Sequence, residues 1–201
     1  MSASHPESIR WIGDIHGDPW FGTYAGLIAT ALPTRQIGDL GLGFGTPPRL
    51  AAKDRFIRGN HDDPALCRAH PNWIPDGTIA DGIFYVGGAA SSDRARRVEG
   101  QGWWRDEELD LADWDRVIAT YAAARPRVVA SHDAPESVRA QLFPVPWDLA
   151  PSRTRQALDA LLALHAPQTW IFGHWHAHRD AVIGGVRYIA LATHQALDLA
   201  L

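Results

Sequence analysis

The sequence contains almost no cysteine and no long apolar stretch. Cys67 is the one cysteine in 201 residues, so an intrachain disulfide cannot form and a reducing compartment is favoured. Residues 1–6 lack the apolar core of a signal peptide, and no stretch approaches the roughly 20 apolar residues that cross a bilayer. We therefore expect a cytoplasmic protein that has no membrane partner.

An excess of basic residues is missing as well. The 19 lysines and arginines are outnumbered by 23 aspartates and glutamates, which gives a net charge of −4. This balance argues against long nucleic acid as a partner, although a nucleotide or a short nucleic acid stays open. With 46% hydrophobic residues the chain can bury a sizeable core, so we expect a single domain over residues 1–201.

Side chains of the kinds that bind metals gather in five short stretches. Each stretch follows a run rich in Val, Ile and aromatic residues, and such a run predicts a short buried strand. The stretches are Asp14-Ile15-His16, Gly38-Asp39, Gly59-Asn60-His61-Asp62, Ser131-His132-Asp133 and Gly173-His174-Trp175-His176. Open α/β sheets place their sites beyond the carboxyl ends of the strands. The pattern therefore predicts a site at the carboxyl ends of these strands.

The residue types in these stretches favour transition metals. Asp14 and His16 lie two residues apart after an extended segment, so both side chains can reach one cation. A mixture of carboxylate, imidazole and amide ligands suits Mn, Fe(II), Zn, Co or Ni, and it suits Ca or Mg poorly. None of the stretches contains cysteine, which excludes a thiolate zinc site. A carboxylate such as Asp39 can bridge two ions, so the set can hold two divalent metals.

The order of these motifs resembles the calcineurin-like metallophosphoesterase family. The matching positions run from Gly13 to His176 and therefore cover most of the chain. The resemblance implies an α/β fold, namely a four-layer α-β-β-α sandwich of two mixed sheets flanked by helices. A weaker similarity, over Gly87 to Trp104, is to small bacterial and phage-type members of the family.

The resemblance also implies a role for each residue. One metal would be held by Asp14, His16, Asp39 and His176, and the other by Asp39, Asn60, His132 and His174. His61 matches a histidine that faces the substrate, and Arg58 matches an arginine that contacts phosphate in the protein-phosphatase branch. We further interpret Asp62 as a carboxylate that orients His61.

One departure from the family pattern concerns the second motif. Many relatives continue it as Gly-Asp-x-x-Asp with an arginine following, whereas here Asp39 is followed by the run Leu40 to Gly45. The substrate contacts of the protein Ser/Thr phosphatases are therefore not carried over to this chain. The predicted metal ligands are unaffected.

These features predict a metal-dependent phosphoric ester hydrolase that uses two divalent ions, with Mn favoured over Fe, Zn, Ni or Co. A metal-bridging hydroxide would attack a phosphate monoester or diester directly, while His61 protonates the leaving oxygen or stabilises phosphoryl charge. A nuclease or cyclic-nucleotide phosphodiesterase with the same chemistry is one alternative. A non-catalytic metal-binding scaffold on the same fold is the other. The sequence leaves open the physiological substrate, the native metal and the oligomeric state.

The segment between Asp62 and Val128 contains no predicted ligand, and substrate choice is therefore assigned to it. Its central part holds three arginines and two adjacent tryptophans, namely Arg94, Arg96, Arg97, Trp103 and Trp104. The arginines could clamp a phosphate and a tryptophan could stack on a base. The alternative is a basic loop paired with acidic residues, together with two core tryptophans.

Helical and hairpin patterns alternate with the predicted strands, as in a layered α/β fold. One helix is predicted over 106–124, and another begins near Ser152. Apolar stripes indicate their buried faces, with Trp114, Val117, Ile118 and Tyr121 on the first, Leu158, Leu161 and Leu162 on the second, and Trp20, Tyr24, Leu27 and Ile28 on a third helix. Residues 182–189 are predicted to form a hairpin centred on Gly184-Gly185.

Overall fold

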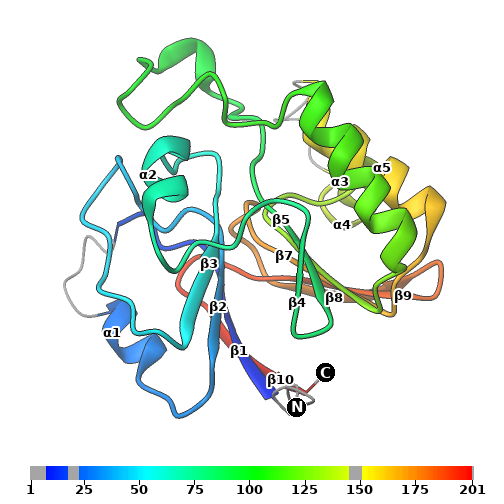
Figure 1. The fold of residues 1–201 in the computed structure, drawn as a ribbon, viewed down its shortest axis with the longest axis horizontal. Helices are drawn as coiled ribbons and strands as arrows, with labels where there is room; N and C mark the ends of the chain where they lie inside the picture. The colour runs from blue at the N-terminus through cyan, green and yellow to red at the C-terminus, as the bar shows by residue number, and fades with distance from the viewer. Residues whose placement is uncertain (1–7, 18–22, 145–150, 201) are drawn as a thin grey trace.

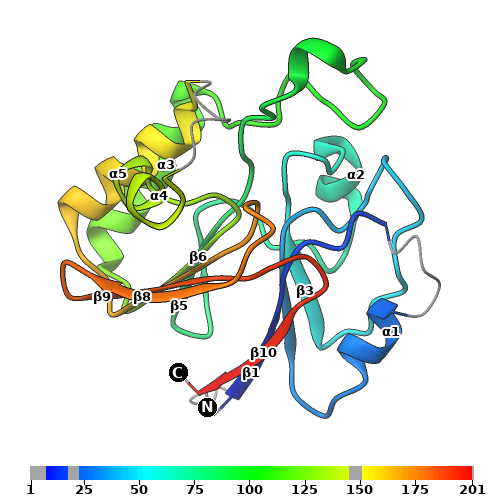
Figure 2. The ribbon, with the colours of Figure 1, turned by 180° about the vertical axis from the view of Figure 1, so that it is seen from behind.

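The computed structural model describes residues 8–17, 23–144 and 151–200. Over these ranges the chain forms two β-sheets that pack face to face, with helices on the outer face of each (Figures 1 and 2). Helices α1 and α2 lie on one side, and helices α3, α4 and α5 lie on the other (Figure 1). None of the described helices is long and apolar enough to cross a membrane.

The first sheet has four strands in the order β10-β1-β2-β3. Strands β1, β2 and β3 are parallel, and β10 pairs with β1 in the antiparallel direction. The bounds of its elements are β1 (Ser8–Ile12), β2 (Thr34–Ile37), β3 (Asp54–Ile57), β10 (Ala196–Ala200), α1 (Thr23–Ile28) and α2 (Pro64–Ala69). The parallel strands run in one direction, so the loops after β1, β2 and β3 emerge at the same end of the sheet.

The second sheet has six strands in the order β4-β5-β6-β7-β9-β8. The four central strands are parallel, and β4 and β8 add antiparallel edges. The bounds of its elements are β4 (Thr78–Ala80), β5 (Ile83–Val86), β6 (Val128–Ser131), β7 (Thr169–Phe172), β8 (Arg179–Ile183), β9 (Val186–Ala190), α3 (Leu111–Ala124), α4 (Glu136–Leu142), α5 (Arg153–Leu164) and the 3-10 helix η1 (Arg94–Arg96).

Three separate apolar cores show that the fold has four layers. Strand β7 illustrates why, because Trp170 and Phe172 pack in the core beneath α3 and α5 while Ile171 packs in the core between the sheets. A third core, which includes Ile12 and Phe56, lies between the first sheet and its helices. Strands buried on both faces read as continuous apolar runs, as β6 and β7 do, whereas β2 is fully buried although three of its four residues are polar. The four-layer α-β-β-α sandwich of two mixed sheets is thus confirmed.

The sequence predicted the start of α5 correctly and the start of α3 incorrectly. Helix α5 begins directly after Ser152, whose hydroxyl accepts the Arg155 N–H at 3.1 Å, as the sequence predicted. Helix α3 was predicted from 106 but begins at Leu111, because the Asp110 carboxylate caps it by accepting the Asp113 N–H at 2.8 Å. The apolar stripe of α3 is buried as predicted, with Trp114, Val117 and Tyr121 fully inside.

The predicted hairpin and the predicted motif strands are present. Strands β8 and β9 form the hairpin around Gly184 and Gly185, and a strand precedes each of the five motif stretches. Trp20 of the predicted N-terminal stripe lies outside the described residues, whereas Tyr24 of that stripe is buried in α1. The five stretches consequently lie at the carboxyl ends of β1, β2, β3, β6 and β7.

Candidate metal centre

The loops after β1, β2, β6 and β7 are connected by hydrogen bonds to main-chain carbonyls. The N–H groups of Ile15 and His16 both donate to the Asp39 carbonyl, at 3.0 and 2.8 Å. Across the two sheets, the His132 ring donates from Nδ1 to the Ile37 carbonyl at 2.8 Å. Gly173 N–H then donates to the His132 carbonyl at 3.0 Å. The two sheets therefore meet at the predicted site.

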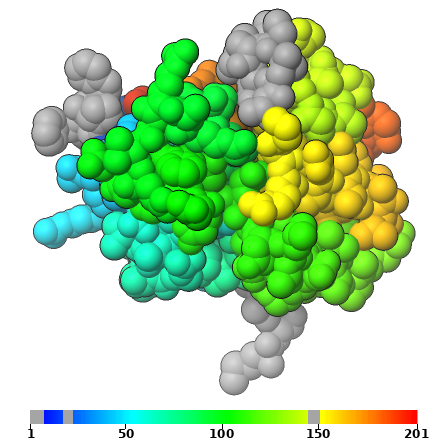
Figure 3. Space-filling view, turned by 90° about the horizontal axis from the view of Figure 1, so that it is seen from above, coloured from blue at the N-terminus to red at the C-terminus, as the bar shows by residue number. Residues whose placement is uncertain are grey.

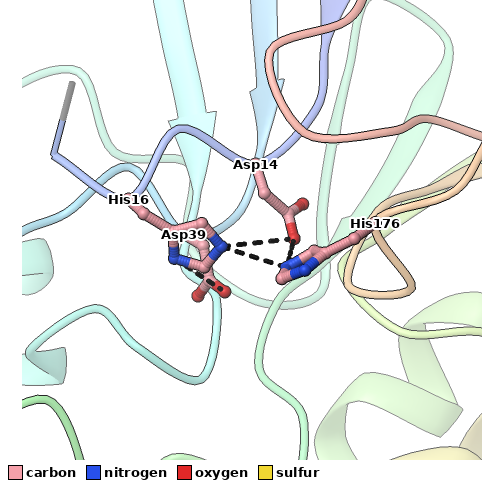
Figure 4. Close-up of side chains that lie close together, drawn as sticks. All are labelled: Asp14, His16, Asp39 and His176. Atoms are coloured by element: carbon pink, nitrogen blue, oxygen red, sulfur yellow. Dashed lines mark hydrogen bonds and ion pairs between the residues drawn. The ribbon is translucent and has the colours of Figure 1, made fainter. Parts of the chain in front are cut away.

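Four of the predicted ligands converge there, namely Asp14, His16, Asp39 and His176, and they point toward one another in Figure 4. Their ligand atoms all lie within 4.8 Å of one another. The Asp14 Oδ2 atom is 3.0 Å from His176 Nε2 and 4.0 Å from His16 Nε2. The Asp39 Oδ2 atom is 3.8 Å from His16 Nδ1. This group has the composition and the spacing of a cation site.

Two buried oxygen atoms test whether a cation fits. Asp14 Oδ2 and Asp39 Oδ2 are both inaccessible to solvent, and no described residue donates to either with good hydrogen-bond geometry, although His176 Nε2 and His132 Nε2 lie 3.0 and 3.6 Å from them. A buried carboxylate oxygen that has no donor is costly unless a cation satisfies it. The Nε2 atoms of His16 and His176 are 3.0 Å apart, close to the roughly 3 Å between ligands at right angles around a cation bound at about 2.1 Å. The residues present therefore fit a divalent metal.

The predicted ligands of the second ion, Asn60, His132 and His174, are not part of that group of four, and His132 connects them to Asp39. His132 Nε2 is 3.6 Å from Asp39 Oδ2 and 3.0 Å from Asn60 Oδ1. Nδ1 donates to Ile37 and Nε2 faces only acceptor oxygens, so both ring nitrogens of His132 carry protons here, and loss of the Nε2 proton would free that nitrogen to bind a cation. The His132 and His174 rings are 5.1 Å apart, and the His174 N–H donates to Asp14 Oδ1 at 3.1 Å.

Electrostatics link this second group to Asp39. Burial lowers the pKa of His132, but attraction to Asp39 outweighs it and raises the pKa of His132 to about 10. Burial would raise the pKa of Asp39, yet His132 reverses the shift and holds the pKa of this carboxyl well below its usual range. Burial also lowers the pKa of His174 well below its usual value. The positive charge of protonated His132 thus balances the negative charge of the Asp39 carboxylate. A bound cation would replace that proton.

The backbone is strained at four of the seven predicted ligands. His16, Asp39, His174 and His176 have φ angles of 53°, 59°, 65° and 52°, in the left-handed region that residues other than glycine seldom adopt. Each such residue costs on the order of 1–3 kcal/mol, and such strain gathers at ligand and active sites. The packing of the two sheets maintains these conformations.

Two glycines that precede predicted ligands, Gly59 and Gly173, let the backbone lie directly against a carboxylate. A Cβ atom at Gly59 would overlap the Asp39 carboxylate, and one at Gly173 would overlap the Asp14 carboxylate. The backbone of one motif therefore lies directly against a predicted ligand from another. This explains in physical terms why Asn60 and His174 both follow glycine.

His61 lies at the edge of the centre and lines a cavity of about 250 Å³ together with Asn60, His174 and His176. Its main-chain N–H donates to Asp39 Oδ1 at 2.8 Å. Its ring nitrogen Nδ1 lies 3.0 Å from the Gly102 carbonyl, and since a carbonyl only accepts, Nδ1 carries the proton. Nε2 is therefore the ring nitrogen that remains for a substrate, as the predicted role requires.

Asp62 differs from its predicted role. Its carboxylate accepts four main-chain N–H groups, from Leu40, Gly41, Leu42 and Gly59, at 2.7 to 3.1 Å. The His61 ring is held by Gly102 instead. Asp62 is thus an anchor for the loop that follows Asp39, because a buried carboxylate is best satisfied by several main-chain donors. Orientation of the His61 ring by Asp62 is not what the structure shows.

Arg58 also lies elsewhere than predicted. Its Nε donates to Asp76 Oδ2 at 2.9 Å, and its Nη1 donates to the carbonyls of Glu107 and Asp106 at 2.7 and 3.2 Å. The side chain is buried, and Arg58 is not among the residues that line the cavity beside His61. The guanidinium is therefore committed to the fold rather than to a phosphate.

We expect Arg58→Ala to destabilise the protein by about 3–5 kcal/mol, because it leaves Asp76 as a buried charge without its partner. The melting temperature should fall by roughly 6–20 °C. The control is Arg68→Ala, which removes an exposed pair with Asp106 at 3.5 Å and should cost less than about 1 kcal/mol. An Arg58→Ala protein with normal stability but slower hydrolysis of every phosphoester would instead support phosphate contact.

The arginines that the sequence assigned to substrate choice differ in whether they line the cavity. Arg97 pairs with Asp93 at 2.6 Å, and both line the cavity beside His61, whereas Arg94 and Arg96 are exposed on η1. Trp104 is buried. Of Arg94, Arg96 and Arg97, only Arg97 therefore lies at the cavity, and it does so as one half of an ion pair.

Two contacts of His61 were not predicted. Phe44, which is 44% exposed, stacks on the His61 ring with centroids 5.5 Å apart, and Arg97 lies 5.8 Å from the centroid of Phe44. Gly102 supplies the carbonyl that accepts from His61. Main-chain carbonyls carry no sequence signal, and a phenylalanine in a glycine-rich loop has no spacing that links it to His61.

Comparison with known proteins gives the fold a context. No protein-family model and no curated protein matches the sequence. The solved structure of TT1561 from Thermus thermophilus has a TM-score of 0.56 at 12% identity, over 97% of this chain and 99% of that chain. The phosphopantetheinyl hydrolase PptH from Mycobacterium tuberculosis has a TM-score of 0.51 at 14% identity, over 94% of this chain and 91% of its own. At 12% and 14% identity these likenesses concern the fold alone, and both cover nearly the whole chain.

Proposed function

We propose that this chain is a phosphoesterase that uses two divalent metals. The observation that carries the proposal is the pair of buried carboxylate oxygens, on Asp14 and Asp39, that accept no well-formed hydrogen bond and lie among histidine ring nitrogens at cation-ligand spacing. The structural likeness to a phosphopantetheinyl hydrolase supports a phosphoester as the substrate. We assign the whole of residues 1–201 to this one catalytic domain.

The two sets of ligands follow the two groups described above. Asp14, His16 and His176 would hold one ion, Asn60, His132 and His174 the other, and Asp39 lies between them. Such ions, when bound, supply Lewis-acid activation of water and neutralise charge on the phosphoryl oxygens. Mn fits a mixed shell of oxygen and nitrogen ligands, and Fe, Zn, Ni and Co fit it as well.

The chain itself contributes a proton at His61. With Nδ1–H fixed on the Gly102 carbonyl, a protonated His61 would donate from Nε2 to the oxygen of the departing alcohol. The stacked ring of Phe44 restricts rotation of the imidazole. Arg97 at the same cavity provides a positive charge for the outer part of the ester, although it shares that charge with Asp93.

The size of the cavity limits how much of a substrate it can enclose. Its volume of about 250 Å³ lies below the roughly 300–1,000 Å³ of pockets that enclose whole drug-sized ligands. The cavity would hold the phosphoryl group and little more, while the rest of the substrate lies against exposed residues. The preference for a small phosphate monoester or diester, a nucleotide included, over a long nucleic acid therefore rests on the net charge of −4.

We expect the purified, chelator-treated protein to bind two Mn ions per chain. Binding at a free concentration 100 times the Kd stabilises the fold by about 2.7 kcal/mol per site, so the melting temperature should rise by roughly 5–10 °C for each ion. Isothermal titration with Mn, combined with a thermal melt at each point, measures both quantities. One bound ion at saturation would contradict the two-metal assignment.

Activity is tested on the same samples. Hydrolysis of p-nitrophenyl phosphate and bis-p-nitrophenyl phosphate should appear as the second ion binds, and the ratio of the two rates assigns a monoesterase or a diesterase. Cyclic nucleotides and single-stranded DNA test the alternatives of phosphodiesterase and nuclease. Two bound ions without hydrolysis of any of these esters would indicate a non-catalytic metal-binding scaffold.

A further inference from the structure

Both the oxygen and the nitrogen of the Asn60 side-chain amide have a hydrogen-bond partner. Its oxygen Oδ1 lies 3.0 Å from His132 Nε2, on the side of the predicted metals. Its nitrogen Nδ2 donates to the Ser91 hydroxyl at 3.0 Å, away from them. Rotating the amide by 180° would turn the nitrogen toward the metals, and an amide nitrogen cannot bind a cation. The contact with Ser91 therefore decides whether Asn60 can act as a ligand.

Ser91 is in turn held by Glu107. The Ser91 main-chain N–H donates to Glu107 Oε1 at 3.0 Å, and the Ser91 hydroxyl donates to Glu107 Oε2 at 2.5 Å. An ionised carboxylate only accepts hydrogen bonds, so it takes both donors of Ser91. The Ser91 oxygen is then left with lone pairs alone, and it can only accept from Asn60.

From this chain of hydrogen bonds we propose that Ser91 and Glu107 are positioning residues that fix the Asn60 amide with its oxygen toward the second metal. The inference rests on the proposed function, because it treats Asn60 as a metal ligand. All three side chains are buried, with exposed fractions of 1% for Asn60, 1% for Ser91 and 4% for Glu107. Water therefore does not compete for the hydrogen bonds, and a reversed amide would leave buried groups unsatisfied.

The negative charge of Glu107 sets which group donates and which accepts in the hydrogen bonds that run from Asn60 through Ser91. Burial raises the pKa of Glu107, and the two hydrogen bonds from Ser91 oppose that shift by favouring the ionised form. A neutral glutamine at this position would present one NH₂ group to Ser91 in place of an acceptor. One donor would then face another, and the Ser91 hydroxyl would be free to donate to Asn60, which favours the reversed amide.

The segment that connects Ser91 to Glu107 also supports the site. Ser91 and Glu107 lie at the two ends of residues 92–106, whose green atoms cover a large part of the face seen in Figure 3. Gly102, within that segment, holds the His61 ring. The segment thus begins and ends at residues that position a ligand, and its middle positions the proton donor.

The test compares Glu107→Gln with a matched control, Glu108→Gln. Glu108 is also buried, and its Oε1 accepts from the Ser152 hydroxyl at 2.9 Å and from Thr154 N–H at 2.8 Å, at the start of α5. Both variants therefore remove one carboxylate charge and disturb the same kinds of contact. Only Glu107→Gln should weaken binding of the second Mn, by roughly 10- to 100-fold, the usual effect of losing a group that orients a ligand.

Isothermal titration of the full chain with Mn measures both binding steps, and thermal melting of the metal-free proteins reports stability separately. Ser91→Ala is the second variant, used where Glu107→Gln does not fold, and it should weaken the same step. The side-chain amide resonances of Asn60 in the metal-free protein should shift in both variants and stay unchanged in Glu108→Gln.

The outcomes separate this inference from the proposed function. A wild-type protein that binds two Mn ions, together with a Glu107→Gln protein that binds the second equally well, overturns the positioning role alone. Equal weakening in Glu107→Gln and Glu108→Gln overturns it too, because the effect would then come from general loosening. A wild-type protein that binds fewer than two ions contradicts the proposed function and this inference with it.

Discussion

His61→Ala is expected to keep both metals and to lose about two to four orders of magnitude in turnover, the range of a general acid. The metals should stay because the contact between His61 and Asp39 is made by the main-chain N–H, which alanine retains. The loss should come from the missing Nε2 proton. Mn titration and steady-state kinetics on one sample measure the two effects separately.

The leaving group gives this prediction a second test. An alkyl phosphate needs a proton on its departing oxygen, whereas p-nitrophenolate leaves readily without one. The loss in His61→Ala should therefore be much larger for an alkyl ester than for a p-nitrophenyl ester. Equal losses on both esters would mean that His61 stabilises the phosphoryl group and does not protonate the alcohol. Loss of metal would show that the His61 ring supports the centre itself.

Asp39→Asn is expected to lose metal affinity, and activity with it. The Asp39 carboxylate is near both groups, with Oδ2 3.8 Å from His16 Nδ1 and 3.6 Å from His132 Nε2. An asparagine removes the negative charge that both ions would share. The fall in Mn affinity should exceed the roughly 10- to 100-fold expected for residues that only orient a ligand. Direct titration with Mn measures it.

The control for this variant is Asp93→Asn. Asp93 lines the same cavity and also carries a negative charge, but it is exposed and pairs with Arg97. Its replacement should leave both binding steps unchanged. If Asp39→Asn retained two ions with wild-type affinity, the carboxylate would not lie between the metals and the two ligand sets would have to be redrawn.

Much of the fold could be predicted because the strands are short and buried on both faces. Such strands have few polar residues inside them, so the point at which polarity returns marks the strand end, as it does at Asp14, His132 and His174. The start of α3 was misplaced because Glu107 and Glu108 look like residues of a first helical turn. Their actual partners, Ser91 and Ser152, lie 16 and 44 residues away and carry no local signal.

The ligand-type residues were easier to recognise than the residues that hold them. Metal ligands must be of a few chemical types, whereas a supporting contact can come from almost any group, including the main chain. Arg58 was wrongly predicted to contact the substrate. Its place beside Gly59 suggested a phosphate contact, but its partner is Asp76, which lies 18 residues further on. The direction of a side chain, unlike its spacing in the sequence, is decided by packing, and Arg58 is directed toward Asp76.

The predicted ligands join one sheet to the other. Asp14, His16, Asp39 and Asn60 follow strands of the first sheet, and His132, His174 and His176 follow strands of the second. The distance between opposing ligands is consequently governed by the thickness of the apolar layer that separates the sheets, which includes Ile57 and Ile171. The interior of the sandwich therefore acts as a spacer between the two sets of predicted ligands.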